Sequence, residues 1–379
     1  MNAFAHTLRL ALFLIMPVCL LSACGGGKTT VSKHADTLRM EYSRLLHIEQ
    51  FDSYRLVTIK DPWANDATLH RYALVDKKSK VPSHLSADVT IVRVPLQKMC
   101  VSTSVHANLY KQLDALDHVG SVCDVNYIID PLILKRIDRG LTGNAGSSMN
   151  PNIERILQYN TDALLMSPFK GTSYGILEKT GLPIIECADY METSTLGRAE
   201  WVKFYGMLVG REREADSLFN LVRNNYNNLK NTVSSDKTRP KLLVDMLNGQ
   251  SWYMPGGNSI YGTLYRDAGA EYRLGKKNTG GTQALTLEAV MTEALDADVW
   301  IIKYGATEDY TYDFLARQNK AYTRFKAFRN RKVYGCNTLR VPFYDEVPFR
   351  PDLLFADLLS IFHPDLLPDH KPRYYFPLK

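Results

Sequence analysis

The stretch Asn152-Ile-Glu154-Arg-Ile156, followed by Thr161-Asp162-Ala-Leu-Leu-Met166, predicts a helix with a glutamate in its first turn and then an apolar strand led by an aspartate. The same plan returns in Thr286-Leu-Glu288-Ala-Val290 and Ala297-Asp298-Val-Trp-Ile-Ile302. The glutamate-to-aspartate spacing differs by two residues between the copies, so the similarity is one of plan and not a strict repeat. The chain therefore contains two lobes with a similar internal arrangement.

Short apolar segments alternate with amphipathic segments around the first copy. The predicted strands cover 98–102, 119–122, 163–166 and 183–187, and the predicted helices cover 105–116, 151–160 and 174–181. This alternation predicts an α/β layered domain with a largely parallel sheet. A second α/β run begins with a strand at 241–247 and a helix at 258–268.

A long helical segment separates the two runs. Apolar residues recur at helical spacing from Trp201 to Val209, Gly210 interrupts them, and the spacing resumes from Ala215 to about Thr232. The second part would extend roughly 33 Å at 1.5 Å per residue. We therefore predict an α/β fold of two Rossmann-like lobes joined by one long α-helix, with a ligand cleft between the lobes.

Residues 36–95 form a small N-terminal β-rich extension. Segments 55–60, 69–75 and 89–94 are β-rich and partly alternating, which predicts a small antiparallel ribbon beside the main body. No chemistry is evident in this region, so its role stays open.

The N-terminus predicts export. Arg9 precedes an apolar run from Leu10 to Leu21, which is typical of a secretory signal and too short to span a bilayer comfortably. Leu21-Ser-Ala-Cys24 resembles the lipobox of bacterial lipoproteins, and the resemblance implies that Cys24 is acylated and becomes the first mature residue. An ordinary signal peptide with Cys24 as a bystander is the alternative.

These observations divide the chain into six parts. They are a signal peptide (1–23), a tether (24–35), the extension (36–95), an N-terminal lobe (96–195), a helical hairpin with the linking helix (196–233) and a C-terminal lobe (240–379).

Charge and cysteine content exclude several function classes. The net charge of +6 is spread along the chain without blocks of like charge, so we predict no nucleic-acid partner. Cys100, Cys123, Cys187 and Cys336 form no Cys-x-x-Cys pair, so they do not indicate a zinc or redox motif. A Cys100–Cys123 disulfide and buried free thiols both remain open.

Four segments together resemble the periplasmic binding proteins for cobalamin, haem and ferric siderophores, whose lobes are joined by a single long helix. They are Ser148–Pro168, Gly206–Asp216, Asp267–Ala270 and Leu285–Val290, and the resemblance covers roughly residues 96–365. It implies a non-enzymatic protein without a cofactor, anchored by lipid in the bacterial cell envelope, facing the periplasm or the cell exterior. It also implies that the protein delivers an iron chelate, haem or corrinoid to the permease of an ABC importer.

The same resemblance implies that Glu154 and Glu288, one on each lobe, dock with arginines of the permease. The alternative is that each glutamate only complements the N-terminus of its own helix.

Ligand contacts are expected in loops at the carboxyl ends of the strands. The candidates are Ser104, His106, Tyr127, Phe169, Lys170 and Tyr190 in the first lobe, and Trp252, Tyr253, Tyr304, Arg340 and Tyr344 in the second. Aromatic walls with a few cations suit a large, flat or metal-chelated ligand, although several of these aromatics are equally compatible with a core position. Of the nine histidines only His106 lies near a predicted cleft loop, so we predict no site for a bare metal ion, and haem ligation by His106 or a tyrosine stays open.

Two other functions are compatible with the sequence. Gly171-Thr-Ser173-Tyr-Gly175 fits the nucleophile elbow of esterases, but Pro168-Phe-Lys170 separate it from the preceding strand. A structural lipoprotein without a ligand is the other alternative.

Overall fold

The computed structural model describes residues 36–234, 238–275 and 279–379. The predicted signal peptide, the tether and the lipidation candidate Cys24 lie outside these residues. Within the described ranges, no helix is long and apolar enough to cross a membrane.

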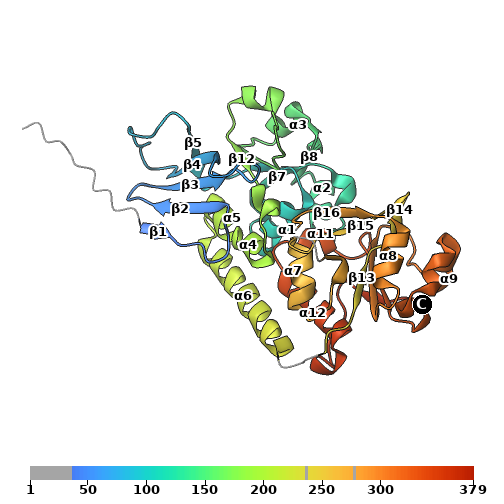
Figure 1. Cartoon of the computed structure of the whole chain (residues 1–379). Helices are drawn as coiled ribbons and strands as arrows, with labels where there is room; N and C mark the ends of the chain where they lie inside the picture. Colours follow the sequence, from blue (N-terminus) through green and yellow to red (C-terminus); the bar gives the residue numbers. More distant parts are fainter. Residues whose placement is uncertain (1–35, 235–237, 276–278) are drawn as a thin grey trace, which may run out of the picture. The chain divides into compact units, whose positions relative to one another are not determined.

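The first lobe is built on a five-stranded parallel sheet (Figure 1). Its strands are β6 (Met99–Val101), β7 (Val119–Val122), β8 (Gly143–Asn144), β11 (Ala163–Met166) and β12 (Ile184–Glu186), and its helices include α1 (Ser104–Gln112), α2 (Pro131–Asp138) and α3 (Ile153–Gln158). The strand order is β12-β11-β6-β7-β8, so successive connections run to one side from β6 to β8 and to the other side from β11 to β12. The direction reverses between β6 and β11, which makes this place the topological switch point of the sheet.

The predicted helix at 174–181 is a 3₁₀ helix, Gly175–Thr180. Gly175 has φ 55° and Gly181 has φ 73°, so left-handed residues bound the segment on both sides. The predicted helix is therefore present in its tighter 3₁₀ form, which is typical of such short segments.

The second lobe contains parallel strands β13, β17 and β18 in that order, with β19 antiparallel to β18, and a separate small antiparallel sheet. The strands are β13 (Leu242–Val244), β17 (Val299–Tyr304), β18 (Val333–Asn337) and β19 (Phe376–Pro377), with β14 (Leu247–Asn248), β15 (Ser251–Pro255) and β16 (Thr282–Leu285) in the small sheet. The helices are α7 (Ile260–Asp267), α8 (Leu287–Ala294), α9 (Tyr312–Gln318), α10 (Lys326–Arg329), α11 (Phe343–Glu346) and α12 (Pro351–Phe362).

The repeated aspartate has the same physical role in both lobes. The Asp162 carboxylate accepts hydrogen bonds from the backbone N–H groups of Gln97 and Lys98, just before β6. The Asp298 carboxylate accepts one from the N–H of Lys241, just before β13. Each aspartate therefore ties the start of its own strand to the start of the neighbouring parallel strand, which explains the repeated pattern.

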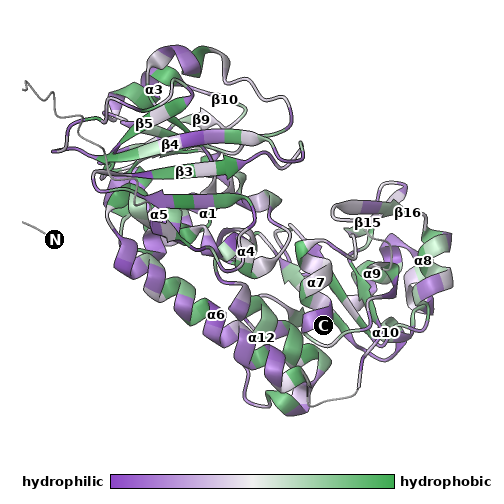
Figure 2. Cartoon of the chain, turned by 60° about the vertical axis from the view of Figure 1, so that its left-hand side comes forward, coloured by the Kyte–Doolittle hydropathy of each residue, from purple (hydrophilic) through white to green (hydrophobic). Residues whose placement is uncertain are grey.

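The linking helix is present where the sequence predicts it. Helix α4 (Thr195–Glu200) and helix α5 (Val202–Val209) precede it, Gly210 turns the chain with φ 68°, and α6 (Glu212–Ser234) follows as one long amphipathic helix (Figure 2). Near its start, Glu212 pairs with Arg55 of the extension at 2.9 Å. Further along, the Tyr226 hydroxyl donates to Asp267 of the second lobe at 2.9 Å. Helix α6 thus contacts both the extension and the second lobe.

The extension is a five-stranded sheet, with two strands more than predicted and a mixed direction. Its strands are β1 (Asp36–Leu38), β2 (Leu46–Gln50), β3 (Tyr54–Lys60), β4 (Thr68–Asp76) and β5 (Val89–Val94), in sequential order. Strands β4 and β5 are parallel, so the prediction of a purely antiparallel ribbon was wrong. Residues 77–88 supply the long connection that a parallel pair requires.

Two buried glutamates fasten the extension to the first lobe. The Glu200 carboxylate accepts hydrogen bonds from the backbone N–H groups of residues 41–43 at 2.8–2.9 Å. Glu192 accepts from the N–H groups of residues 44 and 45 and from the indole N–H of Trp201. Burial alone would raise the pKa of Glu200, but these hydrogen bonds outweigh it and lower that pKa.

Strand β4 covers the free edge of β12. The Tyr72 hydroxyl donates to the carbonyl of Ile184 and accepts from the N–H of Glu186, both at 2.9 Å. These contacts satisfy backbone groups that an edge strand otherwise leaves unpaired.

Cys100, Cys123, Cys187 and Cys336 are all buried free thiols in this fold.

Candidate functional site

A cavity of about 480 Å³ opens at the switch point of the first lobe. Ser102 and Thr103, which follow β6, form one side, and residues 166–169 at the end of β11 form another. The hairpin of β9 (Gly146–Ser147) and β10 (Asn150–Pro151) and the 3₁₀ helix Gly175–Thr180 complete it. Its volume lies within the range of small-molecule sites, and open α/β sheets bind ligands at this place.

The lining of this cavity is polar but uncharged. Eight of the lining residues carry a hydroxyl group, and Met149, Phe169 and Ile176 add exposed apolar surface. Ser102 is 3% exposed, and its Oγ has no hydrogen-bond partner among the residues described. A buried hydroxyl without a partner on a lining residue is a group whose hydrogen-bonding capacity a ligand can satisfy.

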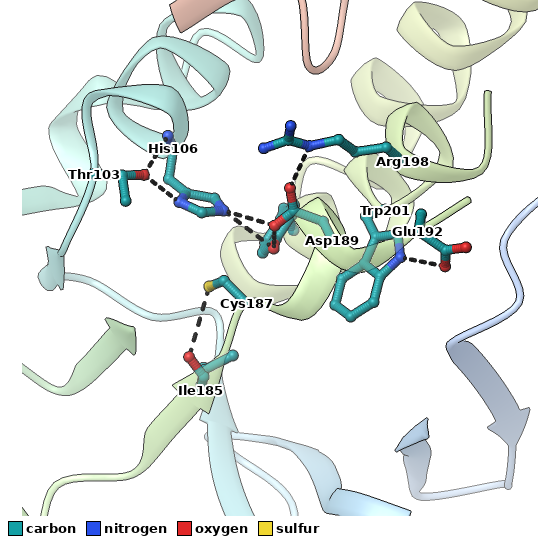
Figure 3. Close-up of polar contacts among 9 residues, drawn as sticks. Thr103, His106, Ile185, Cys187, Asp189, Glu192, Arg198 and Trp201 are labelled. Atoms are coloured by element: carbon teal, nitrogen blue, oxygen red, sulfur yellow. Dashed lines mark hydrogen bonds and ion pairs between the residues drawn. The ribbon is translucent and has the colours of Figure 1, made fainter. Parts of the chain in front are cut away.

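A buried ionic cluster lies beside the cavity (Figure 3). His106 Nε2 lies 3.1 Å from Asp189 Oδ1, the Tyr205 hydroxyl donates to the same oxygen at 2.7 Å, and Arg198 Nε donates to Asp189 Oδ2 at 2.9 Å. The other ring nitrogen of His106 lies 2.7 Å from the hydroxyl oxygen of Thr103, a cavity residue. The cluster therefore fixes the loop after β6 on which one side of the cavity depends.

The charges in this cluster stabilise one another. Burial alone would lower the pKa of His106, but Cys187 and Asp189 outweigh burial and raise it to about 10. Burial alone would raise the pKa of Asp189, but Arg198 and His106 lower it to about 2. Near neutral pH the cluster thus holds an imidazolium, a carboxylate and a guanidinium.

Arg198 is a candidate site residue that the sequence analysis missed. Its side chain is 19% exposed, and Figure 3 shows its two terminal nitrogens pointing away from Asp189. Asp189, the partner of Arg198, lies three residues after the end of β12 and next to the predicted ligand contact Tyr190. The expectation that ligand contacts follow the strand ends therefore pointed to this place. Nothing in the sequence pattern marked Arg198 itself, because it lies inside α4.

The second lobe has a charged pair at the carboxyl ends of β13 and β17. Lys303 Nζ lies 2.8 Å from Asp245 Oδ1 and 5.9 Å from the ring centre of Tyr261. Burial alone would lower the pKa of Lys303, but Asp245 outweighs it and raises that pKa well above its usual value. Lys303 is therefore positively charged at neutral pH.

The structure brings two of the first-lobe candidates into the cavity. Phe169, 52% exposed, and Tyr190, whose hydroxyl donates to the carbonyl of Pro168, both line it. Lys170 and Tyr127 are exposed but lie outside the lining.

Ser104 and His106 both have partners within the protein, and the buried position of His106 contradicts the expectation that it contacts the ligand. The Ser104 hydroxyl donates to Asp345 of α11 at 2.5 Å, a contact between the two lobes. His106 is 2% exposed and is occupied by Thr103 and Asp189, so it presents no free nitrogen to a ligand or to a haem iron.

Among the second-lobe candidates, Trp252 and Tyr304 belong to the core. Trp252 is 0% exposed, and its indole N–H donates to the carbonyl of Val244 at 2.8 Å. Tyr304 is 9% exposed and stacks on Tyr310 with ring centres 3.8 Å apart. Both are therefore withdrawn as ligand contacts.

The remaining second-lobe candidates are at the surface. Tyr253 is 47% exposed and Tyr344 is 56% exposed. Arg340 is exposed, but Asp309 at 3.1 Å already neutralises it. Its charge is thus less available to a ligand than the sequence alone suggests.

Glu154 and Glu288 occupy equivalent positions in the two lobes. Each lies in the first turn of its helix, two residues after the capping residues Asn152 and Thr286. Both side chains are exposed, and no ion pair involves either of them in the part of the chain that the structure describes.

The esterase alternative finds no support in the local structure. Ser173 lies in an exposed loop before a 3₁₀ helix and not at a strand-to-helix elbow, and its hydroxyl donates weakly to Glu178 at 3.4 Å. Across residues 36–234, 238–275 and 279–379, no group of three or more His, Cys, Asp or Glu side chains is arranged to hold a metal ion.

Comparison with known proteins gives one family and several relatives. A family model described as "Periplasmic binding protein" matches residues 139–338, more than half of the chain. An uncharacterized lipoprotein of Methanocaldococcus jannaschii is 27% identical over 327 residues, which are 82% of this chain and 76% of the relative.

Solved structures are similar to this chain in fold. The TroA-like periplasmic binding protein FepB from Veillonella parvula superposes with a TM-score of 0.58 at 15% identity, over 76% of this chain and 96% of that protein. S. aureus IsdE, solved in complex with haem, gives a TM-score of 0.55 at 19% identity, over 70% of this chain and 98% of that protein.

Proposed function

We propose, from the premise that this chain belongs to the periplasmic binding protein family, that it is the lipid-anchored substrate-binding protein of an ABC importer. In this proposal the protein binds an iron-siderophore, haem or corrinoid outside the cytoplasm and delivers it to a membrane permease. It carries out no catalysis and has no cofactor of its own.

The single observation that carries the proposal is the cavity at the switch point of the first lobe. It combines a suitable volume, a mixed hydroxyl and apolar lining and a rigid support from the His106–Asp189–Arg198 cluster. Phe169 offers a broad apolar contact, and the hydroxyl groups of the lining residues offer hydrogen bonds. Proteins of similar fold support iron chelates or haem as the ligand class, and one of them, S. aureus IsdE, was solved in complex with haem.

Lipid anchoring rests on the lipobox-like Leu21-Ser-Ala-Cys24 and on the name of the archaeal relative, a lipoprotein. Residues 24–35 would then act as the tether between Cys24 and the first strand of the extension. Labelling cells with a radioactive fatty acid tests this directly. Acylation of the protein that persists in a Cys24→Ser variant contradicts the proposed anchor.

A thermal-shift panel tests ligand binding. Haemin, cyanocobalamin, and ferric hydroxamate and catecholate siderophores are added to the full chain, with zinc and ester substrates as controls. A ligand at a hundred times its Kd stabilises the folded state by about 2.7 kcal/mol, which gives a measurable rise in Tm. A shift with zinc or an ester alone, or with no compound, contradicts the proposal.

Permease docking by Glu154 and Glu288 is part of the proposal. Two exposed carboxylates at equivalent places on the lobes fit paired cationic pockets on a partner. Glu154→Gln and Glu288→Gln should lower uptake of the identified ligand in cells while its Kd stays unchanged. Glu293→Gln, an exposed glutamate on the same helix as Glu288, is the matched control and should transport normally.

A further inference from the structure

The cavity at the switch point carries no formal charge on its walls. Among the described residues that line it, none is Asp, Glu, Lys, Arg or His. The polar lining consists of hydroxyl groups and the amide of Asn150. A ligand group that enters this cavity therefore finds hydrogen-bond partners but no counter-ion.

The charges immediately behind one wall are negative. Tyr174 lines the cavity. Its hydroxyl donates to Glu186 at 3.2 Å, and its backbone N–H donates to the Glu178 carboxylate at 2.9 Å. The second oxygen of Glu186 is buried without a hydrogen bond in the described structure and lies 3.6 Å from His70 Nδ1. Two carboxylates thus contact the same wall residue, and they disfavour an anion on its other side.

The cations around the cavity either lie outside its lining or are already bound to carboxylates. Lys170 is exposed and outside the lining. The imidazolium of His106, behind the lining residue Thr103, and the guanidinium of Arg198 are both bound to the Asp189 carboxylate, at 3.1 and 2.9 Å. Arg340, in the second lobe, is paired with Asp309. An anionic group placed in the cavity would lose its hydration without gaining a partner charge, which is costly.

Ser102 shows what the cavity can bind instead. Ser102 lines the cavity, and its buried hydroxyl has no partner in the described residues. A hydroxyl can donate to a carbonyl oxygen and accept from an amide N–H. Neutral amide and hydroxamate groups present these atoms at their surface.

From these observations we infer that the cavity takes the neutral, amide- or hydroxamate-bearing face of a metal chelate and disfavours carboxylate and catecholate groups. The inference rests on the proposed function as a chelate-binding protein and narrows its substrate class. Neutral ferric hydroxamates and corrinoids with amide side chains belong to this class, whereas ferric tricatecholates carry net negative charge and haem carries two propionates.

Calorimetric titration of the full chain with four probes tests the inference. Ferrichrome and cyanocobalamin represent neutral chelates, and ferric enterobactin and haemin represent anionic ones. At least one neutral probe should bind about a hundredfold more tightly than both anionic probes. If an anionic probe binds more tightly than the neutral ones, and Phe169→Ala abolishes that binding, the anionic probe occupies the cavity. This result would overturn the inference but leave the proposed function intact.

If none of the four probes binds, the inference and the proposed function both fail. The two kinds of failure are therefore distinguishable in one experiment.

Two substitutions sharpen the test without disturbing the fold. Ser102→Ala removes a hydroxyl that has no partner in the described protein, so the fold should persist while affinity for the neutral probe falls about three- to tenfold. Asn150→Arg places a cation on an exposed lining position and should narrow the preference for neutral over anionic probes about fivefold. Asn228→Arg, an exposed position on α6 outside the cavity, is the matched control and should change neither affinity. An unchanged preference in Asn150→Arg contradicts the charge argument.

Discussion

The two lobes place different structures at equivalent points of similar sheets. In the first lobe β6 leads directly into α1, and the space at its carboxyl end remains a cavity of about 480 Å³. In the second lobe β13 is followed by the β14–β15 hairpin, which brings Trp252 onto the end of the sheet, where its indole donates to Val244. The Asp245–Lys303 pair lies at the same end.

In each lobe, the segment that follows the first strand of the sheet determines whether the carboxyl end of that strand borders a cavity or a packed side chain. The strand starts are tied together in the same way, through Asp162 and Asp298. After β6, Thr103 caps α1 and the chain turns away, which leaves space at the carboxyl end of the strand. After β13, the β14–β15 hairpin folds back over the end of the strand and occupies that space. We therefore propose that ligand binding rests mainly on the first lobe and that the second lobe mainly supports it.

The largest expected effect is on the stability of the second lobe, where Trp252 is packed at the end of the sheet. Trp252→Ala should lower the free energy of unfolding by about 3–5 kcal/mol, because it leaves a cavity among Trp300, Tyr322 and Phe325. Tyr253→Ala, the 47% exposed neighbour, should change it by less than about 0.5 kcal/mol. Urea unfolding measures both, and equal losses in the two variants would contradict the assignment of Trp252 to the core.

The next largest effect is on the His106–Asp189–Arg198 cluster beside the first-lobe cavity. His106→Gln should destabilise the protein by about 3 kcal/mol at pH 6, because it leaves Asp189 with one partner fewer. The pKa of His106 is raised to about 10, so its stabilisation is complete below its ordinary value near 6.5 and is lost as the pH rises through 10.

The difference in unfolding free energy between the original chain and His106→Gln should therefore shrink from pH 6 to pH 10. Urea titrations at several pH values measure it. A difference that grows with pH would show that His106 is neutral in the folded protein.

A smaller effect tests whether Asp162 and Asp298 play the same structural role in their two lobes. Asp162→Ala and Asp298→Ala should each cost about 1–2 kcal/mol of unfolding free energy, since each removes hydrogen bonds to the start of a parallel strand. Asp365→Ala, outside both sheets, serves as the control. A large loss in one lobe and none in the other would break the proposed equivalence.

The smallest expected effect is a change that should be nearly absent. A single rigid helix lacks the hinge of paired strands, and the Ser104–Asp345 contact already joins the lobes. X-ray scattering profiles with and without a bound chelate should nearly superimpose. A marked compaction on binding would contradict this rigidity.

Local patterns predicted the fold well because they reflect local physics. The repeated aspartates, Gly210 and the spacing of α6 each correspond to a hydrogen bond, a left-handed turn or a buried face that the structure contains. The parallel pairing of β4 and β5 was missed because strand patterns do not specify direction.

The site was predicted less well because its burial depends on distant residues. Trp252 and Tyr253 are adjacent in a strand, so one faces the core and the other faces out, but the sequence does not say which. His106 meets Asp189 across 83 residues, and Ser104 meets Asp345 across 241. No local pattern encodes such partners. Phe169 and Tyr190 follow their strands closely and do line the cavity, while their contact with a ligand stays a prediction.

The most direct test of the central claim compares two equally exposed aromatics, Phe169 in the first lobe (52%) and Tyr344 in the second (56%). Calorimetric titration with the probe that binds most tightly, among ferrichrome, cyanocobalamin, haemin and ferric enterobactin, gives the Kd of each alanine variant. We expect the affinity to fall about tenfold or more in Phe169→Ala and clearly less in Tyr344→Ala. A larger loss for Tyr344→Ala would place the ligand against the second lobe and contradict the account.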